Sequence, residues 1–308
     1  MDFSKVFNGV PSDWGSNLSQ KIGNPPKLKT HHCFCMWSDL LGFGEMFQLN
    51  NWSLSHSQKR KIYDRLKAAH SAVLYYSSFE ERNLILNDGI AKVYQPRSRF
   101  MDSSRLLSIS LYFRSCIQLH LSISKEEHEH GFPGCRSVLA FGENIEYLAD
   151  EIRLDDWVYN YSKPHGTKIS NWAQEQGNPI IIYNPKELQM NTAFSKAFLL
   201  ESGGSRIGLP GNHLYIDKST IDAIAQYAKK ESCEIVWGET TNELLLYVTK
   251  DKNNLNDIIM GFCLDLPQIE PNLDKYNTIV YRVKKFYPHD ENPNDFCFDL
   301  DNGYDLVP

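Results

Sequence analysis

The sequence predicts an α+β fold of the ferredoxin-like type, in which an antiparallel sheet carries its two helices on one face. Three observations predict it. Segments with strand and helix character alternate as β-α-β-β-α-β between residues 31 and 143. An Asp-Gly pair separates the two middle strand segments, as is typical of a hairpin. The chain, 308 residues long, is also large enough to bury a core of this kind.

The first two elements are predicted from an apolar run and from a helical period. Residues 31–38 (HHCFCMWS) are the first strand. A helix is expected over residues 55–77, with Ser55 or Ser57 as its N-cap. Its apolar side chains recur at spacings of three and four: Ile62, Leu66, Ala69 and Val73.

A hairpin, a second helix and a fourth strand complete the predicted core. Residues 83–95 (NLILNDGIAKVYQ) place two β-prone runs around the Asp88-Gly89 pair. A helix over residues 103–122 has one apolar side: Leu106, Ile109, Phe113, Ile117 and His120. The strand at residues 134–143 (GCRSVLAFGE) lies between two glycines.

The remaining segments predict three parts: an irregular lead-in over residues 1–30, a core domain over residues 31–217, and an extension over residues 218–308 packed on the same domain. Residues 151–177 are polar, rich in aromatic side chains and without period, so they are interpreted as an insertion. Further helices are expected over residues 191–202 and 218–230, and strands at 178–185, 213–217, 233–239, 243–249 and 278–286. The acidic end, residues 289–308, is expected to be loosely attached.

Composition predicts a soluble, cytoplasmic protein that binds neither membranes nor nucleic acid. The chain is 42% hydrophobic and 23% charged, which is usual for a globular protein, and its net charge of −6 disfavours nucleic-acid binding by the whole surface. No secretory signal is visible, and no apolar run approaches the roughly 18–20 residues of a membrane span. Seven cysteines, an odd number, suggest free thiols in a reducing compartment.

Two carboxylates carry the predicted chemistry. Asp39 follows the first strand, where a lone buried charge would cost several kcal/mol, and Asp88 lies at the hairpin tip 49 residues later. On neighbouring strands they would converge at one end of the sheet and repel each other unless a cation lies between them. Divalent ions held by carboxylates, a backbone carbonyl and substrate phosphates serve nucleotidyl transfer. The glycine-containing turn after Asp39 offers backbone N–H groups to a polyphosphate.

Residues 37–47 (WSDLLGFGEMF) resemble the F-x-D-[IL]-x-G-F signature that opens class III nucleotidyl cyclases, and residues 84–94 (LILNDGIAKVY) resemble the second metal-binding hairpin of that family. The resemblance implies that Asp39, Asp88 and the Leu40 carbonyl bind two Mg²⁺ or Mn²⁺ ions. It also implies that the triphosphate contacts the backbone of the following turn: Leu41, Gly42, Phe43 and Gly44.

Two later stretches are similar to a bacterial branch of this family whose first strand reads D-I-L-G-F. They are residues 135–143 (CRSVLAFGE) and the helix at 191–202 followed by GSRIG. Some members of that branch are pyrimidine cyclases of antiphage systems. The resemblance, which covers residues 31–217 outside the insertion, implies conversion of an NTP such as CTP or UTP to a 3′,5′-cyclic mononucleotide and pyrophosphate. It further implies a homodimer and a downstream effector that senses the cyclic nucleotide.

The later helix departs from the family. It carries Asn191 and Lys196 but no Arg at the family's Asn-x-x-x-Arg offset, and the adenine-selecting Lys and Asp have no counterpart. Lys196 and Arg136 are therefore the candidate catalytic cations, with Arg206 a further possibility. The departure supports an alternative: a degenerate cyclase-fold protein that binds a nucleotide or a protein partner without turnover. A third reading is a palm-like nucleotidyltransferase that joins two nucleotides.

Several of these residues also have purely structural interpretations. Asp39 could N-cap the next helix, Asp88 could serve the turn alone, and Arg136 could form an ion pair. Glu201 is interpreted as structural within its helix. A zinc site is a weaker interpretation of His31, His32, Cys33 and Cys35. His128 and His130 are interpreted as a solvated helix end rather than a metal site. Four aromatic side chains of the insertion could form a base-stacking wall, although packing in an interface is favoured: Trp157, Tyr159, Tyr161 and Trp172.

Overall fold

The structure of the protein is a computed structural model. It describes residues 28–78, 80–96, 104–147, 167–168, 181–182, 188, 190–252, 258–289 and 296–302. Residues 1–27 of the predicted lead-in, most of the predicted insertion and its four aromatic residues lie outside the described residues. Residues 28–30, predicted as irregular, are instead the start of the first strand. Strand β5 (Thr167–Lys168), within the predicted insertion, pairs antiparallel with β6 (Ile181–Ile182), which lies in the strand predicted at residues 178–185.

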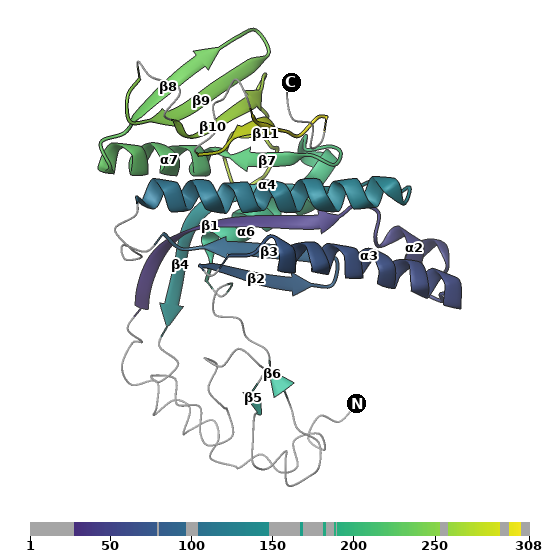
Figure 1. Ribbon diagram of the computed structural model, residues 1–308. Helices are drawn as coiled ribbons and strands as arrows, with labels where there is room; N and C mark the ends of the chain where they lie inside the picture. The colour runs from purple at the N-terminus through teal and green to yellow at the C-terminus, as the bar shows by residue number, and fades with distance from the viewer. Residues whose placement is uncertain are drawn as a thin grey trace, which may run out of the picture. The chain divides into compact units, whose positions relative to one another are not determined.

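The first part of the sheet has the predicted βαββαβ order. Its elements are β1 (Leu28–Leu40), α2 (Glu45–Leu49), α3 (His56–Tyr75), β2 (Glu81–Leu86), β3 (Gly89–Tyr94), α4 (Arg105–Glu129) and β4 (Cys135–Tyr147). In space the strands run β2-β3-β1-β4, and β3 is antiparallel to both β1 and β2 (Figure 1). This is the strand order of the ferredoxin-like arrangement. The predicted α+β class is confirmed.

The later elements extend the same sheet. They are α6 (Thr192–Gly203), the 3₁₀ turn η3 (Gly204–Ile207), β7 (Leu214–Asp217), α7 (Lys218–Lys230), β8 (Glu234–Glu239), β9 (Glu243–Thr249), β10 (Ile258–Asp265), β11 (Val280–Tyr287) and β12 (Phe298–Asp299). Strand β7 pairs parallel with β4 and antiparallel with β11, and the sheet continues as β11-β10-β9-β8. Two compact units result, one formed by residues 32–143 and 192–308, the other by residues 1–31 and 144–191.

Two segments differ from the sequence expectation. Strand β10 was not expected, because seven of its eight residues are buried and it lacks the alternation that marks a half-exposed strand. The acidic end is not loosely attached where it is described, since β12 pairs with β11 and Phe298 is buried. Residues 290–295 and 303–308 of that end lie outside the described part.

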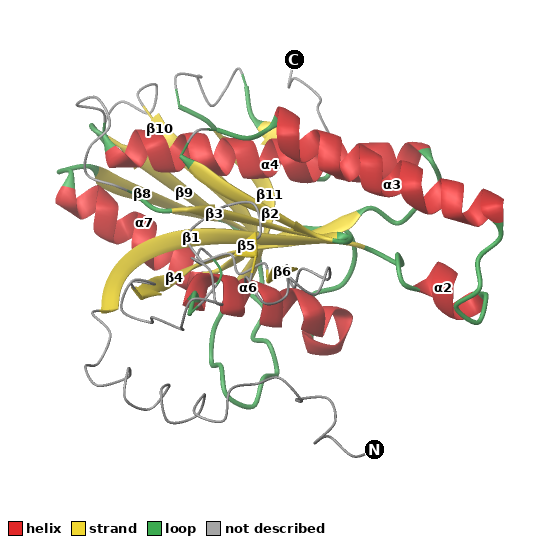
Figure 2. Cartoon of the chain, turned by 90° about the horizontal axis from the view of Figure 1, so that it is seen from below, coloured by secondary structure: helices red, strands yellow, loops and turns green. Residues whose placement is uncertain are grey.

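The helices cover both faces of the sheet. Helices α3 and α4 contact each other on one face, and α6 lies on the opposite face (Figure 2). Alternation along β1 divides its side chains between the two layers. Phe34 packs against Phe113 of α4, whereas Trp37 packs against Phe194 and Phe198 of α6. Asp39 shares the parity of Trp37 and therefore belongs to the α6 face.

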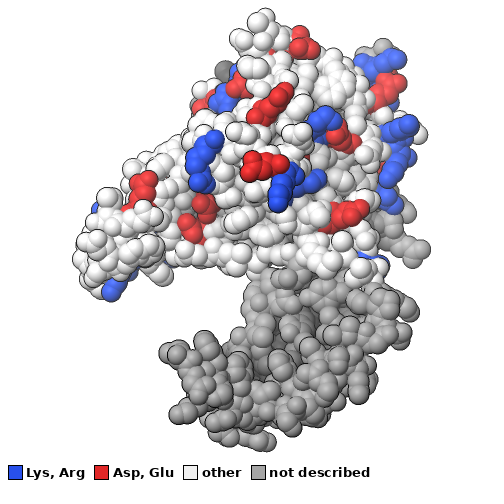
Figure 3. Space-filling view, turned by 180° about the vertical axis from the view of Figure 1, so that it is seen from behind, with Lys and Arg blue, Asp and Glu red and all other residues white. Residues whose placement is uncertain are grey.

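Helix α3 has Ser55 as its N-cap, one of the two residues predicted for that position. The Ser55 hydroxyl accepts a hydrogen bond from the Gln58 backbone amide, and the Ser55 backbone amide donates one to the side-chain oxygen of Gln58, forming a capping box. Helix α4 is longer than predicted. Among the described residues it is the one helix long and apolar enough to span a membrane, but 61% of its apolar stretch is buried in the protein, as in a core helix. Acidic and basic side chains are interspersed on the face shown in Figure 3.

Candidate metal and nucleotide site

The β2–β3 hairpin brings Asp88 to Asp39. Asp39 lies opposite Gly89 in the β1–β3 register, and Leu86 pairs with Gly89 across the hairpin, so Asn87 and Asp88 alone form the loop. Asn87 takes the left-handed conformation, with φ of 59°. The structure thus brings the two predicted metal ligands to the same end of adjacent strands.

Gly89 is required for packing rather than for the turn. A Cβ at this position would lie 2.3 Å from the ring of Trp37, far inside van der Waals contact. The left-handed conformation that an Asp-Gly hairpin usually assigns to glycine falls instead on Asn87. The Asp-Gly pair therefore predicted the hairpin correctly for a different reason. The glycine allows the indole to pass beneath the loop that carries Asp88.

The Asp39 carboxylate has neighbours that repel it and no donor that satisfies it. It is partly buried, and it accepts no hydrogen bond from the residues that the structure describes. Burial, together with the nearby Glu201 and Asp88 carboxylates, raises its pKa to about 7, and Arg136 acts in the opposite direction. A bound cation would remove this electrostatic penalty.

Asp88 is better satisfied than Asp39. The Asn87 side chain donates a hydrogen bond of 2.9 Å to it. Burial still raises its pKa, opposed by its own backbone amide, by Asn87 and by Arg65. The proposed capping role of Asp39 is not observed, because α2 begins after Gly44 and has no side-chain cap. Of the two carboxylates, Asp39 is thus the one that lacks a structural role.

Glu201 is the residue that sequence reasoning missed. It was expected to interact within its own helix, but its Oε1 accepts bonds of 3.1 and 2.9 Å from Nε and Nη2 of Arg136 on β4, and Trp37 Nε1 donates to its Oε2 at 3.3 Å. Burial raises its pKa, and Arg136 lowers it. The Leu-Glu pair that ends the α6 motif was the available signal. Glu201 thus adds a third carboxylate beside Asp39.

Arg136 has the structural role that was weighed as its alternative. Besides its ion pair with Glu201, its Nη1 donates to the Leu209 carbonyl at 3.3 Å. A Cβ at Gly204 would lie 2.6 Å from Nη2, so only glycine leaves room for the guanidinium. Arg136 is still close enough to Asp39 to lower its pKa. It is a fixed positive charge at the edge of the site.

The structure does not bring the other two cations to the carboxylates. Lys196 donates to the Phe141 carbonyl at 2.9 Å and lies 5.7 Å from the ring centre of Tyr276. Phe141 follows Arg136 by five residues on β4, about 16 Å along the strand. Arg206 is exposed and donates to the Ser202 carbonyl in its own turn. A catalytic role for Lys196 therefore stays a prediction that the geometry does not favour.

The turn after β1 is anchored on both sides and open in the middle. The Leu41 amide donates to the Gly134 carbonyl at 2.9 Å, and its carbonyl accepts from Arg65 at 3.0 Å. The Phe43 side chain is buried, and Gly42 has a φ of 66°. The amides of Gly42 and Gly44 donate no hydrogen bond to the described residues. Two amides of the predicted phosphate-binding turn are therefore unpaired.

The donor set fits a hard divalent cation that is completed by its substrate. Within the described segments, no three His, Cys, Asp or Glu side chains are arranged to hold a metal by themselves. Asp39, Asp88 and the Leu40 carbonyl are oxygen donors, and phosphate oxygens complete the shell of such ions. The Leu40 carbonyl accepts one long bond of 3.4 Å, from Phe43. The zinc reading has no such support, because Cys33 and Cys35 are buried whereas His32 is exposed.

The fold and this site define the chain as an α+β protein with a carboxylate pair and an anchored, partly open turn at one end of its sheet. No protein-family model matches the sequence, and no curated protein matches it.

The structure is similar to several solved cyclase domains. One is the guanylyl cyclase Cya2, with 10% sequence identity, coverage of 88% of this chain and 98% of that chain, and a TM-score of 0.41. Another is the adenylyl cyclase CyaB from P. aeruginosa, with 9% sequence identity, coverage of 83% of this chain and 95% of that chain, and a TM-score of 0.37. A third is the guanylyl cyclase domain of the RhoGC fusion protein from the aquatic fungus Blastocladiella emersonii, with 9% sequence identity, coverage of 84% of this chain and 97% of that chain, and a TM-score of 0.36. At such scores and identities, the similarity establishes neither a family nor an activity.

Proposed function

We propose that this protein is a metal-dependent nucleotidyl cyclase, which converts an NTP to a 3′,5′-cyclic mononucleotide and pyrophosphate. The observation that carries the proposal is the Asp39 carboxylate. It lacks a hydrogen-bond donor among the described residues and has a pKa raised to about 7. It also lies beside Asp88, at the start of a turn with two unpaired amides. A carboxylate in this condition favours a cation, and the turn favours the phosphates that accompany it.

In the proposed reaction, one set of residues would hold the metal ions and another set would hold the phosphates. In this reaction the ribose 3′-hydroxyl loses its proton to water as its oxygen bonds to the α-phosphorus. The bond from that phosphorus to the oxygen that bridges to the β-phosphate breaks, which releases pyrophosphate. Asp39, Asp88 and the Leu40 carbonyl would hold the ions. When bound, Mg²⁺ or Mn²⁺ would activate the hydroxyl and neutralise the leaving pyrophosphate. The amides of Gly42 and Gly44 would bind the phosphate oxygens, and Arg136 keeps a positive charge at the edge of the site.

The narrower parts of the proposal depend on the motif resemblance. A pyrimidine NTP such as CTP or UTP is the proposed substrate, and an antiphage alarm signal read by a cyclic-nucleotide-sensing effector is the proposed role. We also propose a cytoplasmic homodimer. The α6 face supports a partner surface, because Phe198 and Leu199 are 46% and 42% exposed there.

Turnover of four nucleotides tests the proposal directly. The purified full chain is incubated with Mn²⁺ and ATP, GTP, CTP or UTP, and the products are identified by mass. One cyclic mononucleotide and pyrophosphate are expected from the wild type and from Asp64→Asn, a control on the exposed Arg60 pair of α3. Asp39→Asn is expected to give no product. A folded wild type that turns over none of the four would contradict the proposal, and a dinucleotide product would indicate the palm-like alternative.

A degenerate, binding-only protein is the second candidate. It is favoured by α6, which presents Phe194 and Phe198 to Trp37 while Lys196 is engaged elsewhere. Calorimetry with each NTP separates the two functions. Tight binding that Asp39→Asn leaves unchanged, without turnover, would support the binding protein.

A further inference from the structure

We infer that Arg65 and Glu127 are positioning residues that hold the turn from Leu41 to Gly44 in its phosphate-binding shape. This inference rests on the proposed function, since it names what fixes that turn from behind. Arg65 comes from α3 and Glu127 from the last turns of α4, 62 residues apart in sequence. Neither residue was singled out by its sequence pattern.

The two side chains form a buried pair with a defined fork. Arg65 is 5% exposed and Glu127 is 4% exposed. Nε of Arg65 donates to both carboxylate oxygens of Glu127, at 2.9 and 3.1 Å, and Nη2 donates to Oε2. A guanidinium bound in this way cannot rotate without losing several charge-assisted hydrogen bonds. Glu127 therefore fixes the direction in which Arg65 points.

The direction that Glu127 fixes is toward the site. The same Nη2 donates to the Leu41 carbonyl at 3.0 Å, and the guanidinium carbon lies 5.5 Å from the ring centre of Phe43. The amide of Leu41 is held from the other side by Gly134. Arg65 thus contacts the backbone one peptide after Leu40 and also the side chain between the two glycines. Both the proposed metal-binding carbonyl and the unpaired amides depend on the same anchor.

A second buried pair shows that burial alone does not explain this arrangement. Lys92 and Glu81 are 0% and 6% exposed, and the Lys92 ammonium donates to the Tyr76 carbonyl at 2.7 Å. That pair lies at the opposite end of the hairpin from Asp88, because Glu81 begins β2 and the loop follows Leu86. It joins structural segments only. Both pairs are therefore buried ion pairs of a glutamate with a basic side chain. They differ in the backbone carbonyl that the basic side chain contacts, which is Leu41 for Arg65 and Tyr76 for Lys92.

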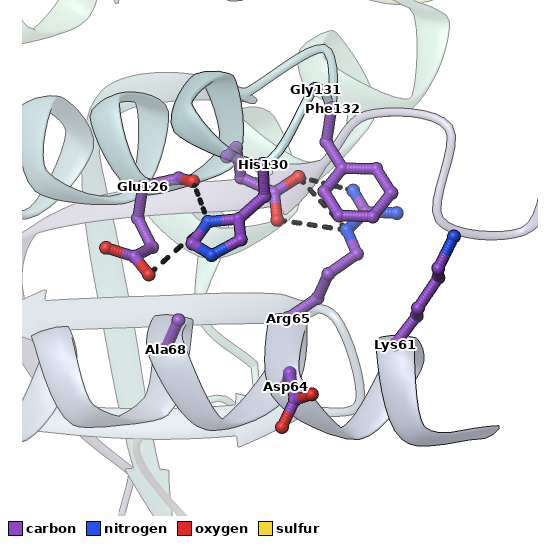
Figure 4. A pocket seen from close by; sticks show the side chains of 9 residues that line it. Lys61, Asp64, Arg65, Ala68, Glu126, His130, Gly131 and Phe132 are labelled. Carbon is purple, nitrogen blue, oxygen red and sulfur yellow. Dashed lines mark hydrogen bonds and ion pairs between the residues drawn. The ribbon is translucent and has the colours of Figure 1, made fainter. Parts of the chain in front are cut away.

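A cavity gives access to the Arg65 pair from outside the site. It has a volume of about 360 Å³ and lies between α3 and the end of α4, lined by Lys61, Ala68, Glu126, His130 and Phe132, among others. Figure 4 shows Phe132 over the Arg65 guanidinium, whose carbon lies 4.1 Å from the ring centre. Arg65 and Glu127 are themselves among the residues that line this cavity, so it adjoins the space that the side chain of Arg65 fills.

The test replaces each pair by apolar residues, because removing one partner would leave a buried charge and could unfold the chain. The double substitution Arg65→Met with Glu127→Leu removes the pair that holds the turn and is called the clamp variant. The control is Lys92→Met with Glu81→Leu. Calorimetry with Mn²⁺ and inorganic tripolyphosphate, which probes the turn without a base, should show at least a tenfold weaker Kd in the clamp variant. The control should stay within twofold of the wild type. Where turnover is measurable, KM should rise tenfold in the clamp variant while kcat changes less than threefold.

Amide hydrogen exchange of the metal-free protein gives a readout that needs no ligand. The Leu41 amide should exchange at least tenfold faster in the clamp variant than in the wild type. In the control, its exchange rate should equal that of the wild type. Equal exchange in all three proteins would overturn the inference whatever the activity. If exchange rises in the clamp variant but the wild type binds no tripolyphosphate, the proposed function fails and the positioning role toward phosphate fails with it.

Chemical rescue tests whether Arg65 acts through its charged guanidinium or only by filling space. In Arg65→Ala, once circular dichroism has confirmed that this variant folds with Glu127 unpaired, millimolar guanidinium should restore slow exchange at Leu41, whereas equimolar urea, which lacks the charge, should not. Rescue by both or by neither would contradict a role that depends on a charged donor at this position.

Discussion

Asp39 and Asp217 are both aspartates at the end of a strand, and their surroundings differ completely. Asp217 ends β7 and is fully buried. It accepts hydrogen bonds from the Ser219 amide at 3.0 Å, from Tyr276 at 3.0 Å and from Thr278 at 2.6 Å. Asp39 lies next to the last residue of β1 and, within the described chain, accepts none.

The difference teaches how to separate a structural carboxylate from a functional one. Asp217 caps α7, so its negative charge satisfies one free amide of the helix, that of Ser219, and the hydroxyls of Ser219, Tyr276 and Thr278. Asp39 faces two other carboxylates and a single guanidinium that is already paired with Glu201. Folding alone therefore gives Asp217 its partners, whereas the proposed cation would be the partner of Asp39.

Exchanging each aspartate for asparagine should produce the largest effect at Asp39. Asn keeps the shape but loses the charge, so the proposed Mn²⁺ binding and the proposed cyclase activity should fall by at least about 10²-fold in Asp39→Asn. Asp217→Asn should retain Mn²⁺ binding within about threefold. Calorimetry with Mn²⁺ and product analysis measure both variants. Equal losses in the two would remove the functional distinction between the carboxylates.

Stability should show the reverse order. Asp217→Ala removes a helix cap and leaves the Tyr276 and Thr278 hydroxyls without their acceptor, a loss of roughly 2–4 kcal/mol in the free energy of unfolding. Asp39→Ala removes a charge that burial penalises, so the metal-free protein should be as stable as the wild type or more stable. Urea unfolding at pH 7 without metal measures the two. A greater loss at Asp39 would show that its charge is satisfied after all.

Packing beneath the hairpin gives a smaller and more local effect. A methyl group at Gly89 would overlap the ring of Trp37, so Gly89→Ala should cost about 1–3 kcal/mol and weaken Mn²⁺ binding by displacing the loop of Asp88. Gly44 has nothing within 4 Å of such a methyl group, and its φ of −69° is ordinary. Gly44→Ala is therefore the matched control, expected within about 1 kcal/mol of the wild type. Thermal unfolding and Mn²⁺ titration compare them.

The pH dependence of stability should be the most specific effect, because it isolates a single carboxyl group. The pKa of Asp39 is about 7 in the folded protein and 3.8 ordinarily, so the folded state binds its proton more tightly. The resulting stabilisation is complete below about pH 4 and is lost as the pH rises through 7. Urea unfolding of metal-free wild type minus Asp39→Asn, from pH 4 to 8, isolates this component. Saturating Mn²⁺ should reverse the trend, and a flat difference would contradict the raised pKa.

The local pattern of the sequence determined the elements and their order. Residues 218–230 were predicted as a helix and form α7 with the same bounds, because an amphipathic period and a capping aspartate are local signals. The shared end of Asp39 and Asp88 also followed, since one hairpin and one strand pairing place them. Strand β10 could not be found in this way, because burial on both faces removes the alternation that identifies a strand.

What only the tertiary structure decided is which charges meet. Glu201 reaches Arg136 and Trp37 across layers, Arg65 meets Glu127 over 62 residues, and Lys196 turns to the far part of β4. A charged side chain carries no local mark of its partner, because ion pairing depends on distance in space and on burial. The sequence therefore determined where the two aspartates lie, and the packing of α3, α4 and α6 decided that one of them is left without a donor.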